Sequence, residues 1–334
     1  MRRIIFGIGS LAAGLLLLFI LIRRIGLEKI IQPFKSFSIY FLILFLIMAA
    51  AILLLSVLRW QIILKSFNFN MPFTIVLSYY VMGFSMSYLT PSARMGGAPL
   101  KAYMLTRHKI PFEKGLSTIL IDNIMETTFD ILFSSVWIII LLLQFELPQR
   151  FETLVVVFLV LAFIFSGIFF IRLYKGKVVF SLIFNWLRMF RFKSAHDLLE
   201  KIRMIDTMFS SFLREKRIAF LWFIILSFFV WAIGLIEYKV ALLAINFNAS
   251  IFQLFLIIVF AVISTMIPIP ASLGILELGQ VSVFTLLGLD PYIGIALAII
   301  LRFRDVLLAL IGVILIYSFS INKLAIILGK WIQK

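Results

Sequence analysis

The chain has 334 residues, of which 63% are hydrophobic and 14% are charged, and its mean hydropathy is +1.16. Soluble domains contain about 45–50% apolar and about 25% charged residues, so the composition excludes that class and predicts an all-α, multi-pass integral membrane protein. The formal net charge of +16 fits basic loops on the cytoplasmic side of a membrane and requires no nucleic-acid partner.

Hydrophobic segments follow one another along most of the chain. A spanning helix needs about 20 apolar residues, so we expect about six full transmembrane helices and several shorter segments. The N-terminal run is longer than the apolar core of a signal peptide, which has about 7–15 residues, and is expected to stay as the first helix. The segments lie at 4–22, 37–58, 73–90, 115–143, 151–171, 218–236, 251–267, 275–288 and 292–318.

Two of these segments are interrupted by similar breaks, at Thr90–Gly97 and at Ile269–Gly274, where Pro, small residues and Gly replace the apolar run. Non-helical backbone at membrane depth is tolerated only where it is packed in protein or lines a polar cavity. Paired breaks in two halves of a chain are typical of a transporter's binding site. We therefore predict two re-entrant hairpins, at 73–110 and 251–288, related as an inverted repeat. Crossing of the membrane by 73–90 is the open alternative.

The segment 172–217 is rich in Lys and Arg and is expected to be cytoplasmic. If 73–110 re-enters, both termini are cytoplasmic, whereas a crossing at 73–90 would place the N-terminus outside. Within 172–217, apolar residues recur at helical spacing and predict an amphipathic helix that lies on the membrane surface or packs against the bundle. These residues are Leu198, Ile202, Ile205, Phe209 and Phe212. We expect the whole of 1–334 to form one transmembrane domain in the cell membrane.

Charged residues within apolar segments are costly and mark functional sites. Asp122, Glu126 and Asp130 share one helical face, and their like charges require cations or protons. Other charges are Arg94 and Glu277 at the breaks, and Arg302, Arg304 and Asp305 in the last segment. We expect Arg94 and Arg302 or Arg304 to pair with Glu277 and the acidic face. Buried ion pairs with a purely structural role are the alternative.

An anionic or phosphate-linked headgroup is the ligand that the breaks favour, because helix N-termini and Arg both bind phosphate. Arg94 and Arg302 would hold the phosphate, and Glu277, Glu126 and Asp122 would bind the polar remainder or a proton. No catalytic residue, metal or cofactor is expected, since the chain has no cysteine and its two histidines lack ligand spacing. The remaining candidate binding residues are Gly96, Gly97, Lys101, Pro270 and Gly274.

The stretch from Pro91 to Tyr103, followed by the acidic helix from Leu120 to Asp130, resembles the first half of one family's signature. The stretch from Pro268 to Glu277, followed by Arg302, resembles the second half. The family is the lysylphosphatidylglycerol synthase transmembrane-region family, also called flippase-like or UPF0104 membrane proteins. The resemblance covers nearly the whole chain.

The resemblance implies a protein that moves lipids with charged or glycosylated headgroups, or acts beside enzymes that make them. The best-known members flip aminoacylated phosphatidylglycerol and carry a soluble aminoacyl-transferase domain, which we do not expect in this chain. Two departures make the best-known members' lipid an unsafe guide to the substrate of this protein. Ala271-Ser272 stands where the family often has Gly-Gly, which should stiffen the turn, and Asp122-Asn123 stands where it often has Glu-Arg.

The leading functional hypothesis is a lipid translocase that moves a lipid with an anionic or phosphate-linked headgroup through a midplane cavity between the hairpins. The sequence has no P-loop motif, so we expect a gradient to drive it or no driving force at all. The alternatives are a membrane-embedded transferase, or its accessory subunit, acting on a polyprenyl-phosphate or aminoacylated lipid, and a purely structural protein. A separate lipid-modifying enzyme is a possible partner, and the oligomeric state stays open.

Overall fold

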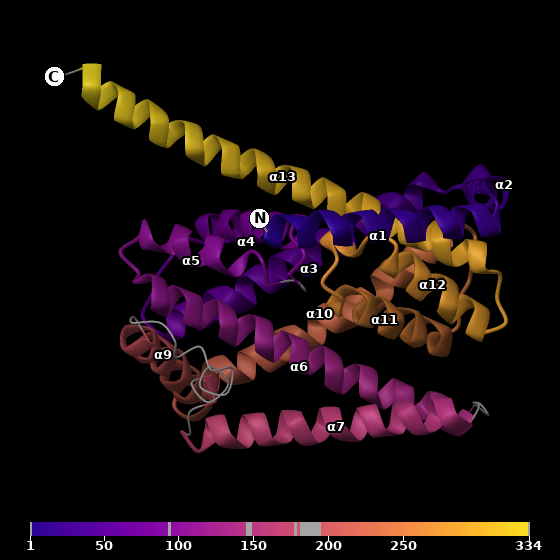
Figure 1. Cartoon of the computed structure of the whole chain (residues 1–334), viewed down its shortest axis with the longest axis horizontal. Coiled ribbons are helices and arrows are strands. Elements are labelled where there is room, and N and C mark those ends of the chain that lie inside the picture. Colours follow the sequence, from indigo (N-terminus) through magenta and orange to yellow (C-terminus); the bar gives the residue numbers. More distant parts are fainter. Residues whose placement is uncertain (1, 93–94, 145–148, 177–178, 181–194, 333–334) are drawn as a thin grey trace. The chain divides into compact units, whose positions relative to one another are not determined.

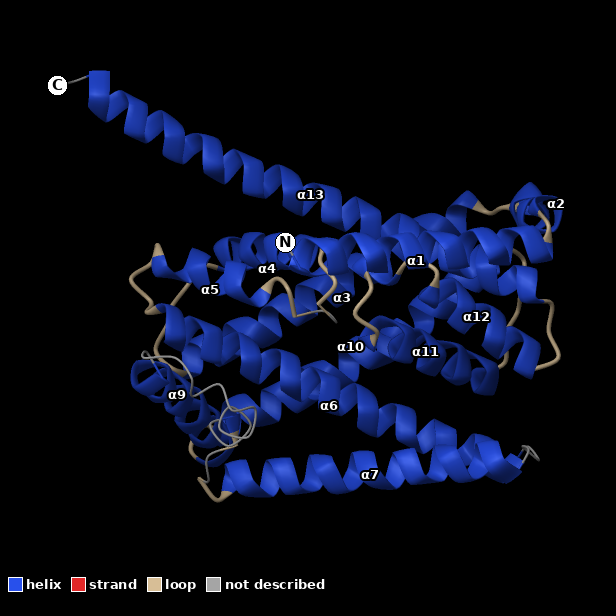
Figure 2. Ribbon diagram, viewed as in Figure 1, coloured by secondary structure: helices blue, strands red, loops and turns tan. Residues whose placement is uncertain are grey.

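The structure, a computed structural model, describes residues 2–92, 95–144, 149–176, 179–180 and 195–332. Within these residues every regular element is a helix and none is a strand (Figure 2). The predicted all-α fold is therefore confirmed.

Long helices occupy all the positions at which a full transmembrane helix was predicted (Figure 1). Each extends past the apolar segment that predicted it at one end or at both. Turns with left-handed residues follow α1 and α3, at Gly26 (φ 91°) and Asn68 (φ 63°). The long helices are α1 (Arg2–Ile25), α3 (Ile39–Ser66), α6 (Phe112–Gln144), α7 (Gln149–Tyr174), α10 (Arg217–Ala244) and α13 (Pro291–Ile332).

Three described helical stretches are long and apolar enough to cross a membrane: Ile39–Ser66, Phe112–Ile140 and Arg217–Ala244. A fourth crossing is possible if Gly9–Ile25 and Leu27–Ser36, which meet at 91°, count as one span. The latter pair comprises part of α1, the short α2 (Leu27–Ile31) and η1 (Gln32–Ser36). In α13, Arg302, Arg304 and Asp305 interrupt the apolar run and have partners inside the protein.

The chain divides into two compact units. Unit 1 consists of 1–50, 72–101 and 236–334, and unit 2 consists of 51–71 and 102–235. In unit 1, α13 packs against α4 (Phe73–Leu89) and α12 (Ile275–Leu286), and α12 also packs against α11 (Ile251–Met266). In unit 2, α6, α7 and α9 (Ala195–Arg214) pack against one another.

The amphipathic helix predicted within 172–217 is α9, and its apolar side packs into unit 2. Phe209 and Phe212 are fully buried, in one cluster with Leu173 of α7 and Ile121 of α6. Asp206 accepts hydrogen bonds from the backbone N–H groups of Val179 and Phe180, both at 2.9 Å. The interpretation as a helix packed against the bundle is therefore the one that the structure supports.

Both predicted hairpins are present as broken helix pairs. The first consists of α4 and α5 (Ala98–Thr106), and the residues on either side of it, 68–71 and 107–110, line one pocket. The segment 73–106 therefore leaves and returns at the same end of the molecule, which supports re-entry over crossing. In the second hairpin, α11 and α12 lie side by side, and Gln280 donates to the carbonyl of Ile257 at 3.2 Å.

The two halves of the chain repeat with a shift of 178 residues. Helices α3 and α10 both have 28 residues and begin at 39 and 217. Each is followed by Asn-Phe-Asn, at 68–70 and 246–248, with the first Asn left-handed at φ 63° and 56°. The following helices begin at Phe73 and Ile251, again 178 apart.

The two equivalent helices run in opposite directions. The backbone N–H of Ser38, before α3, donates to the carbonyl of Ala244, the last residue of α10, at 2.9 Å. In the second half of α3, Arg59 donates to Ser227 in the first half of α10 at 3.4 Å. The hairpins that follow α3 and α10 therefore begin at opposite ends, as an inverted repeat requires.

Candidate functional site

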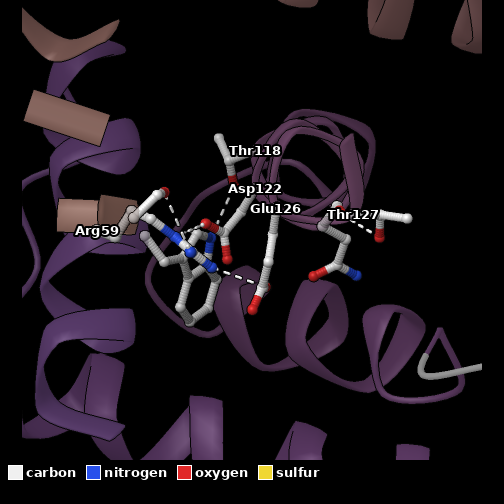
Figure 3. Close-up of polar contacts among 8 residues, drawn as sticks. Arg59, Thr118, Asp122, Glu126 and Thr127 are labelled. Atoms are coloured by element: carbon white, nitrogen blue, oxygen red, sulfur yellow. Dashed lines mark hydrogen bonds and ion pairs between the residues drawn. The ribbon is translucent and has the colours of Figure 1, made fainter. Parts of the chain in front are cut away.

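Helices α3, α6 and α10 build a buried ionic cluster in unit 2, which we call the Arg59 cluster (Figure 3). Arg59 donates from Nε to Asp122 Oδ1 at 2.8 Å and from Nη2 to Glu126 Oε2 at 2.7 Å. Its guanidinium also lies 5.0 Å from the ring centroid of Phe223 and donates to Ser227. Asp122 and Glu126 reach the same Arg because residues four apart share a helical face.

Burial differs sharply within this cluster. The side chains of Arg59 and Asp122 are 1% and 0% exposed, whereas that of Glu126 is 20% exposed. The two carboxylates thus contact the same guanidinium from environments of different exposure. Glu126 is therefore the member that a ligand or a proton could reach with the least rearrangement.

The second break is held by Arg302 in an arrangement that we call the Arg302 clamp. Arg302 makes a bidentate ion pair with Glu277, from Nε to Oε1 and from Nη2 to Oε2, the latter at 2.8 Å. It also donates to the carbonyls of Ala271 at 2.9 Å and Ser272 at 3.1 Å. Arg302 is one of the cations that were expected to pair with Glu277 or the acidic face, and its guanidinium also satisfies two carbonyls that the break frees from helical bonding.

The clamp holds a backbone that is unusual for its residues. Ala271 (φ 54°) and Ser272 (φ 48°) are both left-handed, as is Gly274 (φ 78°) before α12. A left-handed residue other than Gly costs roughly 1–2 kcal/mol. Pro270 is buried in the short η3 (Pro270–Ser272), and a Cβ at Gly274 would lie 2.4 Å from the carbonyl oxygen of Gly14. Pro270 and Gly274 therefore shape and pack the break.

A third ionic group, the Arg304 cluster, lies in unit 1 between α13 and α10. Arg304 donates to Glu237 Oε1 at 2.7 Å and to Asp305 Oδ1 at 2.9 Å, and lies 5.9 Å from the centroid of Phe45. It is the repeat equivalent of the Arg59 cluster. The shift of 178 takes Arg59 to Glu237, Glu126 to Arg304 and Phe45 to Phe223. The ion pair is thus repeated with its two charges exchanged.

The first break is closed by short-range hydrogen bonds. The backbone N–H of Gly96 donates to Ser92 Oγ and that of Gly97 to Ser87 Oγ, both at 2.8 Å. A Cβ at Gly97 would lie 1.9 Å from the carbonyl oxygen of Gly83, so α5 approaches α4 closely only because this residue is Gly. The Gly96 amide thus has its partner within the break, and the Gly97 amide has its partner on α4.

Lys101 is buried beside this contact. Its side chain is 6% exposed, it packs over Gly83, and its Nζ lies 4.9 Å from the centroid of the Tyr80 ring. A cation over an aromatic face is stabilised by the ring's electrons. The structure thus places Lys101 between α4 and α5.

Residues 7–312 match the family described as the lysylphosphatidylglycerol synthase TM region. The chain belongs to this family. No solved structure matches it.

The chain is also similar to several proteins that are called UPF0104 membrane proteins. One from Methanothermobacter thermautotrophicus is 24% identical over 312 residues, which cover 90% of this chain and 89% of the relative. One from Pyrococcus horikoshii is 24% identical over 309 residues, covering 86% and 90%. A second Methanothermobacter protein is 26% identical over 308 residues, covering 86% of each chain.

In this family member, the predicted binding residues fall into separate groups. Glu277, Arg302, Pro270 and Gly274 meet at the second break, and Gly96, Gly97 and Lys101 lie at the first break or beside it. Asp122 and Glu126 belong instead to the Arg59 cluster of unit 2. Arg94 lies outside the described residues, so its pairing stays a prediction.

Sequence reasoning missed Arg59 and Glu237. Each lies one residue past a predicted segment, at 37–58 and 218–236, because hydropathy falls at a charge although the helix continues. The expected partners of the acidic face were Arg94 and Arg302 or Arg304, but its described partner is Arg59. The repeated Asn-Phe-Asn was the available signal. It aligns Arg59 with Glu237 and marks both as equivalent buried positions.

Proposed function

We propose that this protein is a lipid translocase that moves a lipid with an anionic or phosphate-linked headgroup past its two broken helix pairs. The observation that carries the proposal is the contact, within unit 1, between α4 of the first hairpin and η3 in the break of the second. Membership of the lysylphosphatidylglycerol synthase TM region family supports a function at membrane lipids.

The Arg302 clamp offers a mechanism for binding the headgroup. A phosphate has the charge and the bidentate geometry of a carboxylate, so it can replace Glu277 on Arg302 without leaving the guanidinium unpaired. This exchange would release Glu277, whose side chain is only 2% exposed. A buried carboxylate without a partner is unstable, so the bound state would be short-lived, as transport requires.

The partly exposed carboxylate of the Arg59 cluster, that of Glu126, fits a second role in the same proposal. Glu126 would bind a polar part of the headgroup or a coupling proton while Asp122 continues to neutralise Arg59.

The test is a flipping assay in liposomes that contain the purified protein and fluorescent phosphatidylglycerol, read by chemical reduction of the outer-leaflet dye. The wild type should expose inner-leaflet lipid to the reductant. Glu277→Gln and Arg302→Lys should each slow flipping by about tenfold or more, the equivalent of 1.4 kcal/mol lost at the clamp. A pH gradient across the same vesicles would show whether a proton is coupled.

Glu28→Gln is the matched control, because Glu28 is an exposed carboxylate of α2 in the same unit. It should flip lipid at the wild-type rate. The proposal is wrong if Glu277→Gln and Arg302→Lys, both folded by size-exclusion chromatography, flip lipid as fast as Glu28→Gln does.

A further inference from the structure

Two loops of unit 2 lie side by side where α3 and α5 end, and together they line an open pocket. One loop contributes Asn68 to Met71 and the other Arg107 to Ile110. The pocket is separate from the Arg59 cluster. Ser66, the last residue of α3, is roughly 10 Å further along the helix axis than Arg59, at 1.5 Å per residue.

Local hydrogen bonds fix the shape of both loops. Asn68 and Lys109 are left-handed, at φ 63° and 61°. The backbone N–H of Asn68 donates to the carbonyl of Lys65 at 3.0 Å, and that of Lys109 donates to the carbonyl of Thr106 at 3.1 Å. Gln61 donates from its side chain to the carbonyl of buried Met71 at 2.8 Å. The pocket is therefore built before any ligand arrives, which lowers the entropic cost of binding.

The lining residues suit a phosphate. Arg107, His108 and Lys109 are consecutive and exposed, and the exposed amides of Asn68 and Asn70 face them across the pocket. None of the described lining residues is acidic. Arg and Lys bind phosphate through charge-assisted hydrogen bonds, and Asn adds neutral donors.

The repeat shows that the fold does not require this chemistry. The equivalent loop has the same Asn-Phe-Asn turn at 246–248, but there Asn248 and the carbonyl of Ala249 accept hydrogen bonds from Lys239. The residues between α12 and α13 are Leu287-Gly288-Leu289-Asp290, with an acidic residue and no basic one. The same turn thus supports a basic pocket in one half of the chain only.

We propose that the pocket lined by 68–71 and 107–110, the loop pocket, binds a phosphate group, either the phosphodiester of an anionic lipid headgroup or a free phosphate. The lipid is the favoured source, because the loops end apolar helices and therefore lie where headgroups are. Arg107 and Lys109 hold the phosphate, and Asn68 and Asn70 donate to it. This site does not depend on the proposed lipid translocation, and the two can fail separately.

The test compares two ligands on the full-length protein in detergent. Native mass spectrometry measures binding of phosphatidylglycerol, with diacylglycerol as the lipid that lacks phosphate, and phosphorus NMR line broadening measures binding of inorganic phosphate. Arg107→Gln/Lys109→Gln should weaken phosphatidylglycerol binding by about tenfold or more, because each lost contact is a hydrogen bond between charged groups.

The matched control is Lys175→Gln/Arg203→Gln, which removes the same charge from exposed positions of unit 2 away from the loop pocket. Loss of lipid binding in the pocket variant alone assigns a lipid headgroup site. Loss of inorganic phosphate binding as well assigns a site that also accepts free phosphate. If both variants weaken lipid binding equally, or if neither weakens it, the positive charge acts only through its long-range field and not through a site. Either result would overturn the proposal.

A second pair of variants uses the repeat itself. Asn70→Asp places a carboxylate in the loop pocket and should weaken phosphatidylglycerol binding. Asn248→Asp makes the same change at the equivalent position, beside Lys239, and should leave binding unchanged. Equal binding by these two variants would contradict the proposal even if Arg107→Gln/Lys109→Gln did not fold.

Discussion

Arg59 shows how one side chain can make an acidic helix face tolerable inside an apolar bundle. Asp122 and Glu126 would repel each other at their spacing of four residues, but both bind the same guanidinium, at 2.8 and 2.7 Å. Burying these charges gains little net stability, since desolvation offsets the attraction. Removing one partner is different, because the remaining charges stay buried without compensation.

Arg59→Met should therefore destabilise the protein by about 3–5 kcal/mol, the usual cost of breaking a buried ion pair. Thermal unfolding in detergent, followed by tryptophan fluorescence, measures the change. Arg203→Gln removes an exposed cation of the same unit and should change stability by less than about 0.5 kcal/mol.

The variant Arg59→Met/Asp122→Asn/Glu126→Gln separates charge from packing. Without the two carboxylates the penalty of unpaired charge disappears, so more than half of the lost stability should return. If the triple variant is as unstable as Arg59→Met alone, the Arg59 cluster acts through packing and not through charge.

At the scale of elements, the second break combines a left-handed turn with two L-residues that disfavour it. The sequence predicts that Ala271 and Ser272 stiffen this turn relative to Gly-Gly, and both are left-handed in the structure. The Arg302 clamp holds their carbonyls and so compensates for part of the strain.

Ala271→Gly should relieve that strain. Removing the strain should stabilise the folded state by roughly 1–2 kcal/mol. The greater conformational freedom of Gly stabilises the unfolded chain as well, so the free energy of unfolding should rise by up to about 1 kcal/mol. Thermal unfolding in detergent reports it as a raised midpoint.

Ala298→Gly is the control, because Ala298 is buried within helical α13. At this helical position, replacing Ala with Gly should lower the free energy of unfolding by about 1 kcal/mol. Destabilisation by both substitutions would show that the turn at Ala271 is not strained in the folded protein.

At the scale of the whole molecule, the inverted repeat and the basic loops predict an orientation in the membrane. Loops 67–72 and 107–111 lie at one end of unit 2 and carry Arg107 and Lys109. Cytoplasmic loops are enriched in Lys and Arg. The equivalent loops at 245–250 and 287–290 should therefore face outward, and both termini should be cytoplasmic.

The natural absence of cysteine allows a direct test with single cysteines in intact cells and a membrane-impermeant maleimide. Asn248→Cys and Asp290→Cys should react. Asn70→Cys, Lys109→Cys, Arg3→Cys and Lys330→Cys should react only after the membrane is permeabilised. Opposite labelling of Asn70→Cys and Lys109→Cys would show that 73–106 crosses the membrane.

Much of the fold could be predicted from the sequence, because apolar runs of helical length, breaks with Pro and Gly, and basic loops are local signals. The positions of the long helices and of the two hairpins are of this kind. The helix ends were predicted less well. Hydropathy stops at Arg59 and Glu237, although both helices continue to Ser66 and Ala244.

The sequence by itself determined the class of protein, the family and the repeat, since each depends on residue type and order alone. Only the tertiary structure decided which buried charges meet, because the partners lie on helices that are distant in the sequence. Arg59 is 63 residues from Asp122, and Arg304 is 67 from Glu237. Arg59 of α3 contacts Asp122 of α6, and Arg304 of α13 contacts Glu237 of α10, because the fold brings these helices within reach of each other's side chains. The order of residues along the chain does not show which helices come that close.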